Sequence, residues 1–229
     1  SGEIALQGRL DTRSEAYGIE LRCDSFPLNS FLPADSLGLL DLALQAGGSG
    51  FDPLRAQTRG NIRLQVDRAE FRGRDFGGVK LNANLEGGQL SGRLSDRDEA
   101  LRLLLLISGT LTERKQEVRL TGNVFDFDLA ELGISPQKIG GSFALEAGAS
   151  ASDAGSYTAR IALDSIEVRT RHRTDRIRPT SLSLSSDTTA TRAKLASGDL
   201  SLAFVSPGPV DSLVPALTRS TDILAQQIR

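Results

Sequence analysis

The 229-residue sequence contains no tryptophan and no methionine, and only one cysteine and one histidine. One Cys and one His do not supply the usual ligand set of a zinc site, and a single Cys allows no internal disulfide. Aromatic residues make up 5% of the chain, too few for a surface on which bases stack. A net charge of −2 draws the protein to neither nucleic acid nor an anionic membrane. We therefore expect no metal, no cofactor and no nucleic-acid partner.

Long apolar runs are also missing. The longest is Leu103–Ile107, far shorter than the roughly 20 residues that a membrane span requires. Because the first residue is Ser1 rather than Met, we expect a processed chain or a fragment of a longer protein. Any membrane anchor would then lie outside the fragment.

Catalytic motifs are absent as well. The sequence has no Gly-rich nucleotide loop, no Walker loop and no nucleophile elbow. His172, through which any nucleophile–His–acid arrangement would have to run, lies in an Arg-rich stretch typical of a solvated surface. Asp126 and Asp128 lack further oxygen ligands at calcium-loop spacing, and Cys23 ends an apolar pattern as a small core residue would. We expect no enzymatic activity.

Apolar and polar residues alternate over about a dozen short segments, the period-two pattern of strands with one apolar face. Gly clusters separate these segments: Gly47–Gly50 is expected to form a turn, and Glu86–Gln89 a tight hairpin. Strands this close in sequence favour an antiparallel meander. The sequence therefore predicts a single all-β domain over residues 1–229. The predicted strands are centred on residues 4–10, 17–23, 40–46, 62–66, 79–85, 90–94, 101–111, 118–122, 143–147, 157–163, 182–184 and 200–204.

A five-residue phrase recurs within these strands: apolar, polar, Gly, polar, apolar. Because side chains alternate between faces, the Gly shares a face with its two apolar neighbours. A mid-strand Gly destabilises the fold by roughly 0.5–1 kcal/mol relative to Ala. We therefore interpret it as keeping a concave apolar face open where a larger side chain would block it. The phrase is centred on Gly8, Gly92, Gly109 and Gly122, with Ala83 at the centre of a related copy.

About a dozen strands are more than a flat open sheet usually carries without curling or splitting. A sandwich, a closed barrel and a sheet folded lengthwise into a trough are the three options. Gly and Ala inside the apolar stripe, together with the scarcity of large aromatics, favour the trough with an apolar inner face.

Three stretches have helical features. Residues 26–38 contain two prolines and predict an irregular or short helical excursion. Asp128 begins a capping box that Gly133 closes. Residues 211–229 predict an amphipathic C-terminal helix. Since Leu104 and Leu106 face away from the main apolar stripe, we expect this helix to cover them.

The Arg-rich stretch permits two interpretations. Arg169, Arg171 and Arg173 would project from one face of a strand and could bind phosphate groups. Alternatively, they form a charged outer face or edge that resists aggregation.

Several segments resemble the AsmA-like and TamB proteins. Residues 35–53 read DSLGLLDLALQAGGSGFDP, with a Leu-Gly lead, a strand ending in Gly-x-Gly and an Asp-containing loop. Gly60–Leu64, Gly78–Ala83 and Leu90–Leu94 are similar to the strands that follow in that family. Ala196–Leu202, followed by a helix, resembles the versions found in Bacteroidota.

This resemblance implies a β-taco whose apolar groove shields acyl chains during phospholipid transport and outer-membrane assembly. It implies a periplasmic location, an inner-membrane anchor outside this fragment, and an outer-membrane barrel partner of the TamA/BamA type. The ligand would be a phospholipid or another acyl chain, with Arg169, Arg171 and Arg173 as possible headgroup contacts. The groove would be lined by Leu6, Leu42, Leu44, Ile62, Leu64, Leu81, Leu103, Leu105, Leu120, Phe143, Leu145, Ile161 and Leu163.

A structural or adhesive β-sandwich with a closed core and a protein partner is the alternative. A large apolar surface open to solvent distinguishes the conduit from the sandwich.

Overall fold

A computed structural model describes residues 2–30, 37–152 and 155–209. They form fifteen strands and one 3-10 turn, η1 (Leu28–Ser30), and contain no α-helix. The strands are β1 (Glu3–Asp11), β2 (Ala16–Pro27), β3 (Leu37–Ser49), β4 (Arg59–Phe71), β5 (Arg74–Phe76), β6 (Val79–Glu86), β7 (Gln89–Arg97), β8 (Leu101–Leu111), β9 (Lys115–Asp128), β10 (Gly140–Ser152), β11 (Tyr157–Arg169), β12 (Thr174–Ile177), β13 (Thr180–Ser186), β14 (Ala190–Ser197) and β15 (Leu200–Pro207).

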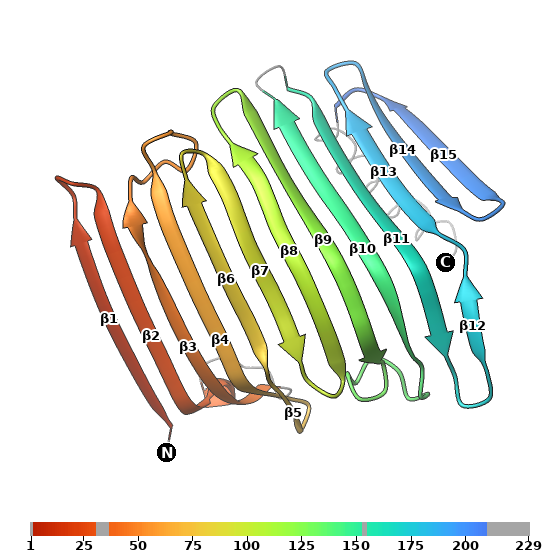
Figure 1. Cartoon of the computed structure of the whole chain (residues 1–229), viewed down its shortest axis with the longest axis horizontal. Coiled ribbons are helices and arrows are strands. Elements are labelled where there is room, and N and C mark those ends of the chain that lie inside the picture. Colours follow the sequence, from red (N-terminus) through yellow and green to blue (C-terminus); the bar gives the residue numbers. More distant parts are fainter. Residues whose placement is uncertain (1, 31–36, 153–154, 210–229) are drawn as a thin grey trace, which may run out of the picture.

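All strands belong to one sheet (Figure 1). Thirteen of them follow the chain in order from β1 to β15, each antiparallel to its neighbour, while β5 pairs only with β4 and β12 only with β11. The predicted all-β antiparallel meander is thus confirmed. The sheet is not closed into a barrel, since β1 and β15 form its two edges.

Glycines set the turns, although not all where the sequence suggested. Gly87 and Gly88 have φ angles of 59° and 75° and join β6 to β7, as predicted for this hairpin. Gly47 and Gly48, in contrast, lie within β3 rather than in a turn. The chain turns at Gly50, whose φ of 83° is a conformation that suits glycine.

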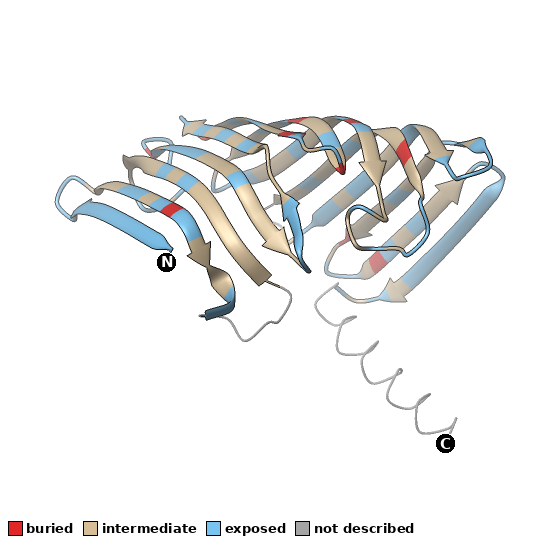
Figure 2. Cartoon of the chain, turned by 90° about the horizontal axis from the view of Figure 1, so that it is seen from below, coloured by how far each residue is buried: buried red, intermediate tan, exposed pale blue. Residues whose placement is uncertain are grey.

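The sheet bends into an arch (Figure 2) and has only one layer in the described part of the chain. Substantial contacts join neighbouring strands of the sheet, and beyond these only β3 with η1. Few side chains are therefore fully buried. The buried apolar residues are Cys23, Ala100, Leu105 and Val124, and the burial of Cys23 agrees with its predicted role as a small core residue.

The predicted helical stretches have mixed outcomes. β2 continues to Pro27, η1 follows at Leu28–Ser30, and β3 begins at Leu37, while residues 31–36 lie outside the described part. The Asp128 carboxylate accepts hydrogen bonds from the N–H of Ala130 (2.9 Å) and of Glu131 (3.2 Å), yet the segment is a turn rather than a helix.

The expected helix over residues 211–229 also lies outside the described residues. Leu106, which it was expected to cover, is 52% exposed. Leu104, on the same face, is half-buried.

Candidate functional site

The strand register aligns the apolar residues of all thirteen consecutive strands. A central row crosses the sheet from β1 to β15, one residue per strand, and every member is Gly, Ala, Ile or Leu. Each member lies directly opposite the next in the register of the paired strands. The row consists of Gly8, Ile19, Ala46, Ile62, Ala83, Gly92, Ile107, Leu120, Ala147, Ile161, Leu182, Leu195 and Leu202.

A second row, the leucine row, lies two residues along each strand and therefore on the same face. It crosses ten strands, which at about 4.8 Å per strand is roughly 43 Å. Nine of its ten members are leucine. They are Leu6, Leu21, Leu44, Leu64, Leu81, Leu94, Leu105, Gly122, Leu145 and Leu163.

A third row lies on the other side of the central row and contains no charged residue. Its members are Leu10, Tyr17, Gly48, Gly60, Leu85, Leu90, Gly109, Val118, Ala149, Ala159, Leu184, Ala193 and Phe204. We call the surface formed by these three rows the apolar face. Its continuity depends on register, because a slip of one residue would turn a strand's apolar residues to the opposite side.

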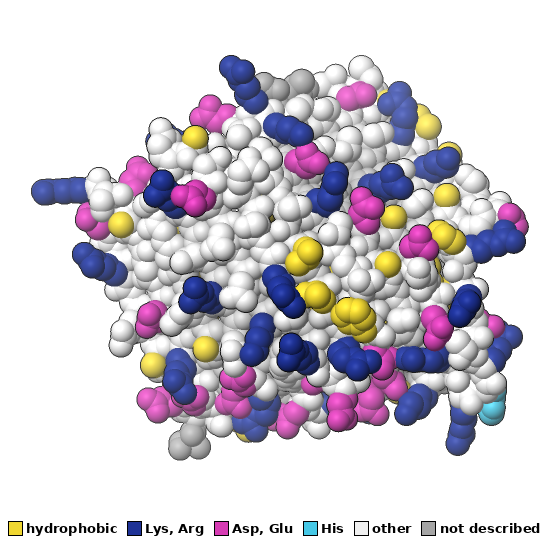
Figure 3. Space-filling model, in the orientation of Figure 1, with side chains coloured by type: hydrophobic (Ala, Val, Ile, Leu, Met, Phe, Trp, Pro, Cys, Tyr) yellow, Lys and Arg dark blue, Asp and Glu magenta, His cyan; other side chains and the backbone are white. Residues whose placement is uncertain are grey.

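The opposite face carries the charges. Residues that alternate with the apolar rows include Arg63, Arg93, Arg119, Glu146 and Arg160. Figure 3 shows Lys, Arg, Asp and Glu spread over this side, with few hydrophobic side chains. It is the upper, convex side of the arch in Figure 2, so the apolar face is the concave one.

All thirteen residues predicted to line a groove lie on the concave side. Ten belong to the central and leucine rows. The other three, Leu42, Leu103 and Phe143, each lie two residues before a member of the leucine row on the same strand. Their exposure differs widely: Leu6 is 68% exposed and Ile161 45%, whereas Leu105 is 6% exposed. The middle of the sheet thus forms a packed floor, and parts of the apolar face remain open.

Sequence reasoning missed part of this face. Leu195 on β14 and Leu202 on β15 continue the central row, and Leu94 continues the leucine row. Leu94 was visible as the last residue of a Gly-centred phrase. β14 gave a weaker signal because its other inward positions are the small Ala193 and the polar Thr191.

The phrase glycines lie in strands and on the apolar face, but their role differs from the predicted one. A Cβ at Gly122 would collide with the carbonyl oxygen of Leu104, and one at Gly109 with that of Glu117. A Cβ at Gly92 would lie 2.9 Å from the Asn82 carbonyl oxygen. At these three positions glycine is needed because neighbouring strands approach closely. Of the four glycines, only Gly8 leaves room for a Cβ, whose nearest neighbour would be the Gly18 carbonyl oxygen at 4.0 Å.

The predicted arginine set does not share one strand face. Arg169 is the last residue of β11, and Arg171 lies in the turn that precedes β12. That turn is closed by a hydrogen bond from the Thr170 N–H to the Arg173 carbonyl (2.8 Å). The prediction that the three arginines project from one face of a strand is wrong, because β11 ends at Arg169 and a turn follows.

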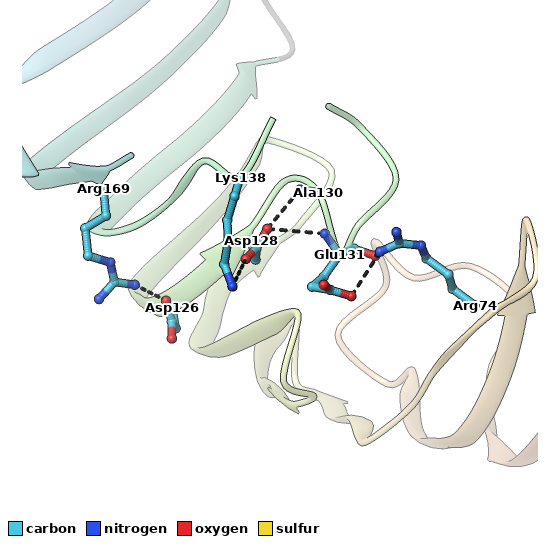
Figure 4. Close-up of polar contacts among 7 residues, drawn as sticks. All are labelled: Arg74, Asp126, Asp128, Ala130, Glu131, Lys138 and Arg169. Atoms are coloured by element: carbon cyan, nitrogen blue, oxygen red, sulfur yellow. Dashed lines mark hydrogen bonds and ion pairs between the residues drawn. The ribbon is translucent and has the colours of Figure 1, made fainter. Parts of the chain in front are cut away.

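Two of the three arginines are also neutralised locally. Arg169 pairs with Asp126 (Figure 4) and Arg173 with Asp175 at 2.7 Å. A cavity of about 450 Å³ is lined by Arg169 and Arg171, together with Lys138. Asp126 and Asp128 line the same cavity, so it presents both signs of charge.

The end of the sheet near this cavity has a contact between β5 and the loop after β9. Arg74 on β5 donates hydrogen bonds to the carbonyl (2.8 Å) and the carboxylate (3.0 Å) of Glu131, in the loop after β9 (Figure 4). The strands next to them, β4 (the partner of β5) and β9, are separated in the sheet by β6, β7 and β8. The contact therefore ties together two distant parts of one end of the arch.

The lone histidine and the lone cysteine of the chain lie in different parts of the sheet. His172 is exposed in the β11–β12 turn. Burial raises the pKa of the Cys23 thiol, which disfavours its reactive thiolate form. Residues 2–30, 37–152 and 155–209 hold no group of three or more His, Cys, Asp or Glu side chains placed to bind a metal ion.

Searches for similar proteins gave no match to a family model, to a curated protein or to a solved structure. No helix within the described residues is long and apolar enough to cross a membrane.

Proposed function

We propose that the concave apolar face binds the acyl chains of phospholipids or related lipids, and that the protein is a lipid-conduit module. The observation that carries this proposal is the continuous apolar face, which no other described element covers. Large exposed apolar surfaces on natural proteins usually mark sites that bind a ligand, a membrane or another protein. The face forms the inner side of a trough that a lipid tail can enter.

The chemistry of the face suits an acyl chain. Transfer of a CH₂ group out of water stabilises the complex by about 0.8 kcal/mol. The central and third rows contain no charged or amide side chain, and the Tyr17 hydroxyl is their one side-chain hydrogen-bonding group, so few directional bonds would fix a ligand at one point. A chain bound in this way can slide along the rows, which is what transport requires.

The wider setting of the proposal rests on the sequence resemblance to AsmA-like and TamB proteins. That resemblance supports a periplasmic location, phospholipid as the cargo, and a barrel partner in the outer membrane. The sandwich alternative requires a second layer over the apolar face. The described residues form one layer only, so they favour the conduit.

The test is lipid co-purification with a matched pair of variants on β4. Ile62, in the central row, is 44% exposed, and its neighbour Asn61 is exposed on the convex side. Ile62→Glu places a charge on the apolar face, and Asn61→Glu places the same charge on the polar face. Phospholipid per protein would be measured by mass spectrometry after solvent extraction, with circular dichroism to confirm folding.

We expect stoichiometric lipid with the wild type and with Asn61→Glu, and a reduction of several-fold with Ile62→Glu. A folded wild-type protein that repeatedly carries no lipid would refute the proposal. Equal lipid in both variants would show that binding occurs elsewhere than on the apolar face.

A further inference from the structure

The two edge strands of the sheet differ in their protection against pairing. Natural edge strands usually carry charges, prolines or bulges that block further pairing. β1 carries Glu3, Arg9 and Asp11. β15 reads LSLAFVSP, has no charged residue, and pairs with β14 without a register shift. Its Pro207 comes only at the end.

β15 is also apolar and accessible. Leu200 is 52% exposed, Leu202 56%, Phe204 49% and Val205 64%. Within the described chain, β14 is its only strand partner, and no described residue pairs with the backbone groups of its outer edge. An uncharged, exposed edge of this kind is a template for adding another strand.

The direction of the strands determines which partner fits. From β1 to β15 the path has thirteen strands and therefore twelve antiparallel steps, so the two edge strands run in the same direction. Placing β1 of one copy beside β15 of another by simple stacking would create a parallel pair. A two-fold axis beside β15 and perpendicular to the sheet instead pairs β15 with the β15 of a second copy in antiparallel fashion, which continues the pattern of the whole sheet.

This self-pairing also has a matching register. With Leu202 opposite Leu202 of the second copy, Leu200 lies opposite Phe204, and Phe204 opposite Leu200. All three side chains point to the apolar face. Such aromatic and aliphatic cross-strand pairs stabilise a sheet, and no like charges meet.

We infer that β15 is a dimerisation edge, at which a second copy of this chain pairs antiparallel and joins the two apolar faces into one. The inference does not depend on lipid binding, because backbone pairing and the three apolar contacts require no ligand.

The test is the association of the full chain, measured by analytical ultracentrifugation over a concentration series. The Leu202→Lys substitution places like charges opposite each other across the two-fold axis and should raise the dimer dissociation constant about tenfold or more. Leu6→Lys is the control, since Leu6 is at least as exposed (68% against 56% for Leu202) but lies on the other edge, on the same concave face. It should leave the dimer unchanged.

Mixing Leu202→Lys with Leu202→Glu adds a test of register, because opposite charges would then meet. We expect the mixture to form a heterodimer while each variant alone stays weakened. A wild type that is monomeric at every soluble concentration would overturn the inference, as would a dimer insensitive to Leu202→Lys. Equal weakening by Leu6→Lys would indicate stacking of apolar faces, and would also reject pairing at β15.

Discussion

Gly122 on β9 lies directly opposite Leu105 on β8, and it interrupts the leucine row at its most buried point. A Cβ at Gly122 would lie 2.9 Å from the Cα of Leu105 and would collide with the Leu104 carbonyl oxygen. Both obstacles are backbone atoms that cannot rotate away. We therefore expect Gly122→Ala to lower the free energy of unfolding by about 1–3 kcal/mol, as overpacking typically does. Urea denaturation would measure it.

Gly8 provides the control, since it is the centre of the same phrase on the edge strand β1. The nearest atom to a Cβ there is the Gly18 carbonyl oxygen at 4.0 Å. Gly8→Ala should leave stability unchanged or raise it by up to roughly 1 kcal/mol, because Ala loses less entropy than Gly in a strand. Equal effects of the two substitutions would contradict the close-approach explanation.

The sequence predicted the strands because alternation is a local property. β6 and β7 and the hairpin between them were recognisable from Val79–Leu85, Leu90–Leu94 and the two glycines between them. Three strands escaped detection. β5 has only three residues, β14 has small inward side chains, and β12 lies within the Arg-rich stretch. Their hydrogen bonds come from the backbone of a neighbour, which no side-chain pattern reveals.

The apolar face was predictable residue by residue, but its continuity was not. Alternation shows that Leu64 and Leu81 each lie on an apolar face, yet only the connection through β5 places them opposite each other. The arginine prediction failed for the same reason. The bonds that close the Thr170–Arg173 turn depend on a backbone reversal that the Arg spacing does not encode.

Asp96 is a carboxylate in an apolar setting. It is 8% exposed and lies opposite Leu103. Burial raises its pKa, and the nearby charge of Asp98 adds to that effect, although the Asp98 N–H donates a hydrogen bond to its carboxylate at 2.9 Å. The ionised carboxylate is therefore less favourable in the fold than in the unfolded chain, and Asp96→Asn should raise the melting temperature at pH 7.

The pH dependence of this effect has a definite sign. A folded pKa above the unfolded value means that the folded protein binds the proton more tightly. The wild type therefore gains stability as the pH falls through that folded pKa. The advantage of Asp96→Asn should shrink as the pH is lowered from 7 towards 4, which a series of thermal melts would show. A constant difference across that range would contradict the assignment.

Asp187 behaves in the opposite way. It accepts hydrogen bonds from the hydroxyl (2.5 Å) and N–H (2.7 Å) of Thr189 and from the N–H of Ala190 (2.9 Å) in the β13–β14 turn. These bonds lower its pKa from 3.8 to about 2. The stability they provide is complete above pH 4 and is lost as the pH falls towards 2.

Asp187→Asn should therefore reduce the loss of melting temperature between pH 4 and pH 2. Thr189→Val, which removes the hydroxyl donor but retains the carboxylate, should reduce it partly. If the acid-induced loss is the same in both variants as in the wild type, other carboxylates are responsible.

The leucine row is buried in the middle of the sheet and exposed at the edge strand β1. Truncating its most buried and its most exposed leucine should therefore have different effects on stability. Leu105 is 6% exposed and Leu6 68%, although both are leucines of one row. Leu105→Ala removes buried methyl groups and leaves a cavity, so we expect a loss of about 2–5 kcal/mol in the free energy of unfolding. Leu6→Ala should change it by less than about 0.5 kcal/mol. Urea denaturation of both variants, fitted with a common slope, provides the measurement. A similar loss for both would mean that the margin of the apolar face is covered rather than open, and the trough would then be closed to a lipid at β1.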